Sequence, residues 1–367
     1  MPETGIQTAA IYFPSWYDDP RRARDFGPGW SEWELVKAGR PRFEGHYQPI
    51  VPAWGHADES DPAVMQRSCN AASTAGIDAF LWDWYWYGEQ DFLNRPLDET
   101  FLNLTDPGIK FALMWANHDW IDVFPARTGK PGDLFARGAV DPRQFADMAD
   151  VIIERYFSHP NYWRPDGTTW FTVFQPTTLI AGLGGYDQTA RSLEMFRKRT
   201  RDAGAGELHI NAMGSFGDLS PEAVANLGFD SFGHYNWSGL MPKDQGLQVD
   251  YRPWREAAAR QWRTDDARFQ PWLDTIPNLT MGWDSTTRVH QDDEIIVGNW
   301  PFLPVVTGNT PEEFAIAARD IVAYINERQG SRIVTINAWN EWTEGSYLEP
   351  DDRYGMQYLD ALRAILT

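Results

Sequence analysis

The chain has 367 residues, of which 43% are hydrophobic, and its formal net charge is -20. Such an acidic surface disfavours nucleic acid and anionic membranes as partners, because both would repel it. The single cysteine, Cys69, excludes an internal disulfide framework, and no apolar run approaches the roughly 20 residues that a membrane-spanning helix needs. Residues 1–10 lack the basic and apolar pattern of a signal peptide. We therefore expect a soluble chain, either cytoplasmic or exported with its signal peptide already removed.

Apolar runs that are typical of buried strands alternate with helical patterns along the chain. The predicted strands cover residues 9–16, 77–86, 109–117, 168–176, 208–214, 229–237, 279–285 and 333–342. The predicted helices cover residues 62–75, 92–104, 142–157, 188–203, 221–227, 253–269, 311–327 and 355–366. Pro96 interrupts the second of these helices. This alternation predicts an α/β fold, a single (β/α)8 TIM barrel that forms one domain over residues 1–367.

The chain is longer than an ordinary barrel, and most of the excess follows predicted strands. The long segments are residues 17–61, 118–141, 238–252 and 286–309, although residues 158–167 and 270–277 form longer loops on the other side. In a TIM barrel the strand-to-helix loops build the active site at the carboxyl ends of the strands. The insertions therefore predict which end of the barrel carries the function.

Polar and aromatic side chains recur where the predicted strands end, and these ends converge on one mouth in a barrel. Aromatic rings beside hydrogen-bonding groups suit a sugar, which has apolar C–H faces and a polar rim, and the chain contains 19 Trp. We predict a carbohydrate substrate that contacts Tyr12, Trp16, Asp83, Tyr85, Trp115, Asn117, His118, Gln175, His234, Tyr235, Trp283, Asp284, Asn340 and Trp342, together with Glu34 and His46 in the loop after the first strand.

The segment W-D-W-Y-W at residues 82–86 carries two sets of side chains on opposite faces of one strand. Asp83 and Tyr85 form one set, and the tryptophans at 82, 84 and 86 form the other. Alternation alone leaves open which set faces the barrel interior. At least one set of these tryptophans is therefore expected to be core.

The last predicted strand ends in N-E-W-T-E-G, with Glu341 and Glu344 among tryptophans. Glutamate is rarely buried unless it is paired, and an apolar aromatic setting raises its pKa by desolvation. One glutamate of such a pair can donate a proton near neutral pH while the other remains ionised as a base or nucleophile. Paired carboxylates in an aromatic pocket are the equipment of glycoside hydrolysis, so Glu341 and Glu344 are the predicted catalytic residues.

Other chemistries find little support in the sequence. It contains no glycine-rich nucleotide motif, no G-x-S-x-G elbow and no H-E-x-x-H spacing. A metal site built from Asp83, His118 and His234 is an alternative that the spacing does not support. We therefore expect no metal and no cofactor.

Three motifs carry a resemblance to a known family. They are G-W-S-E-W-E-L-V-K-A-G-R-P-R-F-E-G-H-Y-Q-P-I-V-P at residues 29–52, A-G-I-D-A-F-L-W-D-W-Y-W at 75–86 and W-N-E-W-T-E-G-S-Y-L-E-P at 339–350. Over most of its length the chain resembles the WbsX-type family, which bears a polysaccharide-biosynthesis glycosyltransferase label. That family is similar in turn to glycoside hydrolase family 99, the endo-α-mannosidases and endo-α-mannanases, which are (β/α)8 barrels.

The resemblance implies roles for the glutamate pair. Glu344 would be the general acid/base that protonates the leaving oxygen, and Glu341 would take the proton of the sugar's own 2-hydroxyl. This hydroxyl would then form a 1,2-anhydro sugar that water opens with overall retention, on an α-glycoside and with endo action. Thr343 departs from those hydrolases, which have His at this position, and the departure bears on the sugar bound beside the pair.

The residues themselves leave alternatives open. Glu341 could instead be a nucleophile in an ordinary retaining mechanism, with the carboxyl groups about 5–5.5 Å apart, and the spacing of three residues favours retention over inversion. A glycosyltransferase would need a site for a diphosphate, and the predicted mouth shows no basic cluster. A non-catalytic sugar-binding barrel would leave all behaviour unchanged when either glutamate is replaced by Gln.

Overall fold

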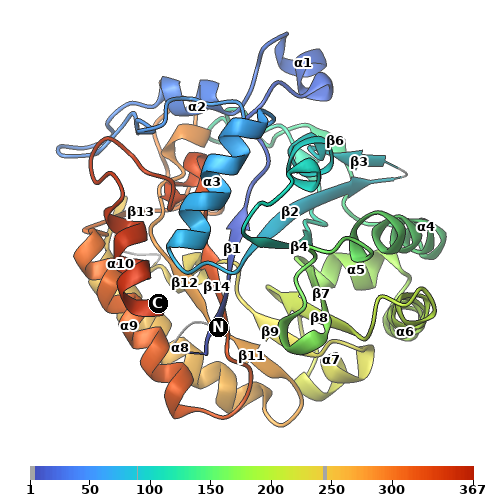
Figure 1. Ribbon diagram of the computed structural model, residues 1–367. Helices are drawn as coiled ribbons and strands as arrows, with labels where there is room; N and C mark the ends of the chain where they lie inside the picture. Colours follow the sequence, from blue (N-terminus) through green and yellow to red (C-terminus); the bar gives the residue numbers. More distant parts are fainter. Residues whose placement is uncertain (1–4, 89, 243–245) are drawn as a thin grey trace.

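The computed structural model describes residues 5–88, 90–242 and 246–367. Its centre is a sheet of parallel strands in the order β11-β9-β8-β7-β4-β2-β1-β14-β12. The strands are β1 (Gln7–Tyr12), β2 (Ala79–Tyr87), β4 (Lys110–Trp115), β7 (Thr169–Val173), β8 (Leu208–Met213), β9 (Ser231–Gly233), β11 (Asp274–Ile276), β12 (Asn278–Thr280) and β14 (Ile333–Asn337). They enclose a nearly closed barrel (Figure 1), so the predicted fold class is confirmed.

The barrel is interrupted at one place, Pro277. On one side of this residue β11 pairs with β9, and on the other side β12 pairs with β14. Proline has no N–H to donate to a ladder, so the seventh position of the barrel is filled by two short strands instead of one long strand. The predicted bounds 279–285 are therefore wrong, because pairing begins before Pro277 and ends at Thr280.

Helices surround the barrel (Figure 1). They are α3 (Pro62–Thr74), α4 (Pro142–Ile152), α6 (Tyr186–Asp202), α7 (Pro221–Leu227), α8 (Tyr251–Phe269), α9 (Pro311–Glu327) and α10 (Gln357–Leu366). Proline in the first turn and a capping side chain explain several of the starts, as for α4, where Asp141 and Gln144 form a capping box. A π-helical stretch, η3 (Ile153–Phe157), continues α4.

The helix predicted over residues 92–104 is wrong. Its first residue, Phe92, belongs to β3 (Gln90–Phe92), which folds back antiparallel onto β2. What remains is a π-helical turn, η1 (Pro96–Thr100), followed by a 3-10 turn, η2 (Phe101–Asn103). Phe92 lies opposite Tyr85 in the hairpin, and this cross-strand aromatic contact outweighs the local helical pattern.

The long insertions follow strands, as predicted, and carry elements of their own. These are α1 (Pro20–Phe26), α2 (Trp33–Ala38), β5 (Trp120–Ile121), β6 (Leu134–Ala136), α5 (Pro176–Gly182), η5 (Ser238–Leu240), β10 (Gln248–Asp250), η6 (Thr286–Arg288), β13 (Val305–Thr307), β15 (Asn340–Glu341), η7 (Trp342–Glu344) and β16 (Ser346–Tyr347), whereas η4 (Pro165–Gly167) precedes β7 in the loop at 158–167. Residues 243–245 of the insertion at 238–252 lie outside the described residues. In Figure 1, α1, α2, β3 and β6 gather at the top of the view, at one end of the barrel.

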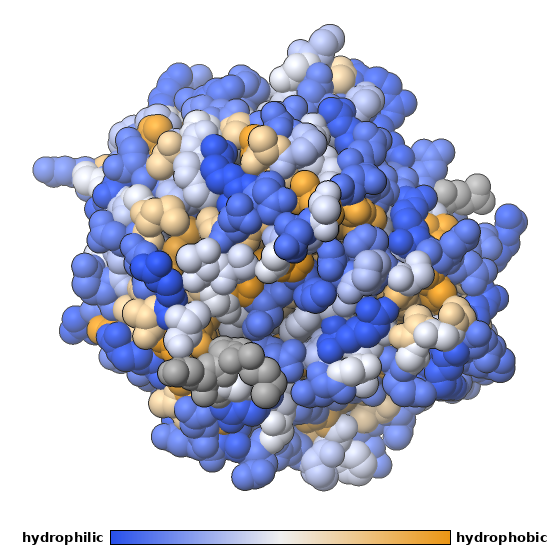
Figure 2. Space-filling view, in the orientation of Figure 1, coloured by the Kyte–Doolittle hydropathy of each residue, from blue (hydrophilic) through white to orange (hydrophobic). Residues whose placement is uncertain are grey.

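The core fills the barrel and the space between strands and helices. One apolar cluster joins residues of every barrel strand to the inner faces of the surrounding helices. The face shown in Figure 2 is mostly hydrophilic, with small hydrophobic patches, as the net charge of -20 leads one to expect. Within residues 5–88, 90–242 and 246–367, no helix combines the length and apolarity needed to span a bilayer.

Candidate active site

A cleft of about 830 Å³ lies at the carboxyl ends of the barrel strands. Its wall is built from residues at or just after most of these ends, beginning with Phe13 after β1 and finishing with Glu341 and Glu344 after β14. Predicted site residues that line it are Asp83, Tyr85, His118, Gln175, His234, Tyr235, Trp283, Glu341 and Glu344.

The other predicted contacts lie outside the cleft. Trp115 is fully buried and packs toward Phe145 of α4, while Asn117 is buried and bonds the backbone of Gln175. Glu34 is exposed and pairs with Lys37 on the surface of α2. His46 and Asp284 bond each other behind the cleft wall, with 2.8 Å between Nε2 and Oδ2.

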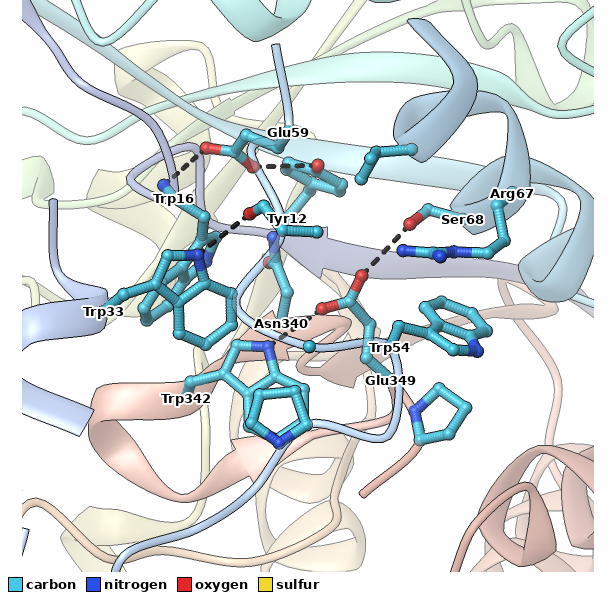
Figure 3. Close-up of a pocket in the computed structure, with 15 residues that line it drawn as sticks. Tyr12, Trp16, Trp33, Trp54, Glu59, Arg67, Ser68, Asn340, Trp342 and Glu349 are labelled. Atoms are coloured by element: carbon cyan, nitrogen blue, oxygen red, sulfur yellow. Dashed lines mark hydrogen bonds between the residues drawn. The ribbon is translucent and has the colours of Figure 1, made fainter. Parts of the chain in front are cut away.

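Four further predicted contacts line a second, smaller cavity on the outer side of β1 (Figure 3). Its volume of about 20 Å³ has room for roughly one water molecule and none for a sugar. Two carboxylates, the buried Glu59 and the half-buried Glu349, accept hydrogen bonds there from a backbone amide and from side chains. The predicted residues in this cavity are Tyr12, Trp16, Asn340 and Trp342.

The contacts of the W-D-W-Y-W segment show which set of its side chains faces the cleft. Asp83 and Tyr85 face the cleft. Trp82 stacks on Tyr12, with ring centroids 4.0 Å apart, and Trp84 donates a hydrogen bond to Tyr156 in the helical layer. The tryptophan set of this strand is therefore core.

Glu341 and Glu344 are placed by a tight turn after β14. Glu341 ends β15, Glu344 ends the 3-10 turn η7, and Gly345 follows in the left-handed conformation with φ of 60°. The Asp284 amide donates to the carbonyl oxygen of Glu344 at 2.6 Å. A Cβ atom at position 345 would lie 2.6 Å from the Asp284 Cβ, so only glycine fits this turn without displacement.

One arginine, Arg288, joins the two glutamates. Its guanidinium nitrogens lie 3.5 Å from Glu341 Oε2 and 3.8 Å from Glu344 Oε1. Arg288 is 3% exposed, so little solvent screens these charges. The Trp300 indole N–H donates to the same Glu344 oxygen, Oε1, at 2.8 Å.

A third buried carboxylate, Glu32, belongs to the same charge network. Arg288 lies 3.2 Å from its Oε2 and Arg22 lies 2.9 Å from its Oε1. Thr343 and Ser15 also donate hydrogen bonds to it, at 2.8 and 3.0 Å. Both arginines line the cleft, so its wall carries two basic residues where the sequence showed no basic cluster.

The three glutamates of this network differ in their tendency to ionise. Burial raises the pKa of Glu341 well above its usual value, the charge of Glu344 adds to the rise, and Arg288 opposes it. Burial also raises the pKa of Glu344, against Arg288 and the Trp300 hydrogen bond. Burial alone would raise the pKa of Glu32 too, but Arg288 and Arg22 hold it below its ordinary value. Glu32 is therefore the ionised member, and the pair retains a proton more readily.

Asp83 is a further carboxyl group in the cleft. Its Oδ2 accepts a long hydrogen bond of 3.3 Å from the Tyr235 hydroxyl, and its buried Oδ1 has no partner within the described residues. Burial raises the pKa of Asp83 well above its ordinary value. A buried polar atom without a partner is unusual in a folded protein, and here it faces the cleft.

Asp284 supports the turn that carries Arg288. His46 and Gln48 donate to its Oδ2, and the Thr286 amide and hydroxyl donate to its Oδ1. These bonds outweigh burial and lower the pKa of Asp284. The loop after β1 thereby fixes η6, whose last residue is Arg288.

Asp83, His118 and His234 do not converge on one point. His234 bonds Asp265, and the His118 ring bonds the backbone oxygen of Asp119. In the part of the chain that the structure describes, no three His, Cys, Asp or Glu side chains are grouped as metal ligands.

The family model described as Glycosyltransferase WbsX matches residues 8–362. The chain belongs to this family. Two curated relatives, each called uncharacterized protein WxcX and found in two strains of Xanthomonas campestris pv. campestris, are 29% identical to it over 381 residues. The alignments cover 100% of the chain and 50% of each relative, so this WbsX chain spans about half the length of the curated relatives it matches.

Solved structures share the barrel of this WbsX family member. A GH99 endo-α-mannosidase from Bacteroides thetaiotaomicron, in complex with bis-tris propane, aligns with a TM-score of 0.60 and 14% identity over 98% of this chain and 96% of that one. A glycoside hydrolase-like protein gives 0.62 and 15%, over 99% and 94%. A β-glucosidase from Thermotoga maritima with castanospermine gives 0.52 and 11%, over 98% and 97%. At these identities the likeness shows the fold, and the predicted similarity to the family 99 barrels is confirmed.

The raised pKa of Glu341 predicts how stability depends on pH. A pKa that is higher in the folded than in the unfolded state stabilises the fold at low pH, and this contribution is lost as pH rises through the folded value. Glu341→Gln removes the ionisable group, so the free energy of unfolding of this variant should be higher than that of wild type. The difference between the two proteins should grow between pH 5 and pH 8. Urea unfolding curves across this range measure it, with the exposed Glu44→Gln as control. A difference that does not vary with pH would contradict the assignment.

Proposed function

We propose that the chain is a glycoside hydrolase that cleaves glycosidic bonds of a polysaccharide or oligosaccharide. The observation that carries the proposal is the buried pair Glu341 and Glu344, which lines a large cleft and shares one arginine. The cleft is also walled by aromatic rings, among them Tyr85, Trp120 and Trp300, which suit the C–H faces of sugars.

In this proposal Glu344 protonates the leaving oxygen of the scissile bond. Glu341 either takes the proton of the sugar 2-hydroxyl or attacks the anomeric carbon itself, and both routes give retention of configuration. Arg288 stabilises the negative charge that remains on the pair when one proton is present. The Trp300 N–H fixes one oxygen of Glu344, which leaves the other for the substrate.

The remaining cleft groups bind the sugar in this proposal. The unpartnered Oδ1 of Asp83 is an acceptor for a sugar hydroxyl, and the Tyr235 oxygen beside it, whose proton is donated to Asp83 Oδ2, is a second acceptor. Tyr85, His118, Gln175, His234 and Trp283 complete the polar and aromatic lining. The GH99 endo-α-mannosidase neighbour supports an α-glycoside and endo action as the first substrates to test.

A second candidate function is glycosyl transfer, which the description of the WbsX family model favours. A diphosphate leaving group needs free cationic groups, a metal or a helix terminus. Arg22 and Arg288 are the buried cations of the cleft, and both are paired with Glu32. This pairing places hydrolysis ahead of transfer.

The test is a glycan-library digestion with the wild-type chain, followed by an NMR time course of the released anomer. We expect cleavage of at least one neutral glycan, with the anomeric configuration retained. A parallel thermal-shift screen compares nucleotide sugars with oligosaccharides. Stabilisation by nucleotide sugars without cleavage of any glycan would contradict hydrolysis and support glycosyl transfer.

A further inference from the structure

The charges around the glutamate pair do not balance when all groups are ionised. Two buried guanidinium groups, Arg22 and Arg288, face three buried carboxylates, Glu32, Glu341 and Glu344. Asp83 also faces the pair, but burial raises its pKa well above the ordinary value, so it counts as neutral here. A proton on one of the three glutamates then removes the excess negative charge, and burial makes an excess charge costly. The network therefore favours a single proton, and the question is which carboxylate holds it.

The contacts of Glu32 exclude it as the proton carrier. Its two oxygens accept from Ser15 and Arg22 on one side and from Thr343 and Arg288 on the other, all at 3.2 Å or less. Glu341 has weaker partners, Thr343 at 3.5 Å and Arg288 at 3.5 Å. The proton thus falls to the pair, which lines the cleft.

We propose that Glu32 is a positioning residue whose charge occupies the arginines, so that the Glu341–Glu344 pair retains one proton for catalysis. The inference rests on the proposed glycoside cleavage and deepens it. It also explains the W-S-E-W-E motif, whose first acid lies in the site while the second, Glu34, lies on the surface. Thr343, at the position where the resembled hydrolases have His, connects Glu32 to Glu341 through its hydroxyl group.

Charged and titratable groups from several elements face this network, including His118 after β4, which feels the charge of Arg288, and Tyr87 of β2, which feels that of Arg22. Arg22 comes from α1, Arg288 from η6, and the pair from the turn after β14. Asp83, Tyr85 and Tyr235 act on the pair from β2 and from the end of β9. The Glu32 charge itself raises the pKa of both Glu341 and Glu344.

Glu32→Gln keeps the size of the side chain and removes its charge, so two arginines then face two glutamates. We expect both glutamates of the pair to lose their protons at lower pH, and the pH–rate profile to move to lower pH. At neutral pH, kcat/KM should fall by about 10- to 100-fold, as for the loss of a hydrogen bond to a charged group. The matched control is Glu34→Gln, two residues away and exposed, which should leave the profile and the rate unchanged.

Two additions keep the test decisive. NMR titration of ¹³C-labelled glutamate carboxyl groups follows the pair without any substrate, so it applies whether or not a cleavable glycan is found. Glu32→Asp keeps the charge one methylene farther from the arginines, so it should shift the profile in the same direction as Glu32→Gln but by less. An unchanged carboxyl titration in Glu32→Gln would overturn the inference. If Glu344→Gln abolishes cleavage while Glu32→Gln behaves as wild type, the inference fails and the hydrolase remains.

Discussion

Glu344→Gln is expected to lower kcat/KM for glycan cleavage by about 10²–10⁴-fold, the usual contribution of a general acid. Gln keeps the shape of the side chain and can still accept the Trp300 hydrogen bond, but it carries no proton that it can give to the leaving oxygen. The measurement is the initial rate of cleavage of the glycan identified in the digestion screen. Its pH dependence should lose the limb that reports deprotonation of the acid.

The leaving group provides an internal check on this assignment. An aryl glycoside with an acidic phenol leaves without protonation, so Glu344→Gln should cleave it with a much smaller loss than the natural glycan, whereas Glu341→Gln should lose both activities. The matched control is Glu349→Gln, because Glu349 is in the same segment but its carboxylate faces the small cavity behind β1. Equal loss on both substrates would remove Glu344 from the acid role.

Gly345→Ala is expected to destabilise the fold by about 2–5 kcal/mol and to abolish activity. The left-handed conformation costs about 1–2 kcal/mol for an alanine, and the added Cβ would lie 2.6 Å from the Asp284 Cβ and 2.8 Å from its backbone nitrogen. Because backbone is among the atoms contacted, relief requires movement of the segment that leads to Arg288. Urea unfolding and the cleavage rate measure the two effects.

Gly55→Ala isolates the conformational part of this loss. Gly55 also has a positive φ, of 73°, but a Cβ there meets nothing within 4 Å. It should cost only about 1–2 kcal/mol and leave the rate unchanged. If both substitutions lower the free energy of unfolding equally, the close approach of Gly345 to Asp284 does not contribute to the loss.

The barrel could be predicted from the sequence because most of its strands are apolar runs that can be recognised in a short stretch of sequence. β2 and β4 were expected over 77–86 and 109–117 and are found at Ala79–Tyr87 and Lys110–Trp115. The seventh strand was predicted with the wrong bounds, because three-residue strands on either side of a proline give no periodic signal. The hairpin of β2 and β3 was not predicted, because only the contact between Phe92 and Tyr85 distinguishes this segment from a helix.

The location of the cleft was predicted more accurately than the side chains that line it. The side chains of a strand alternate between faces, so an error of one residue moves a side chain to the wrong side of the wall. Phe13 lines the cleft where Tyr12 was expected, and Met114 and Ala116 line it where Trp115 was expected. A register argument from one sequence cannot fix this, because both faces of a buried barrel strand are apolar.

Arg288 and Arg22 were missed for a different reason. Both are in insertions without periodicity, and nothing local distinguishes them from the exposed arginines of the chain. Their significance comes from Glu32, which is far from Arg288 in the sequence and touches it only in the fold. Only the abundance of acidic residues around the glutamate pair hinted that buried positive charge was needed.

The break at Pro277 makes this region the least continuous part of the barrel wall. β9, β11 and β12 are short, and the segment that follows β12 leads directly to η6 and Arg288. Local opening of the backbone is easiest where strands share few hydrogen bonds. Transient opening at this break would therefore move Arg288 away from the two glutamates. We therefore expect the affinity of the two glutamates for a proton to depend on how firmly this joint holds Arg288 beside them.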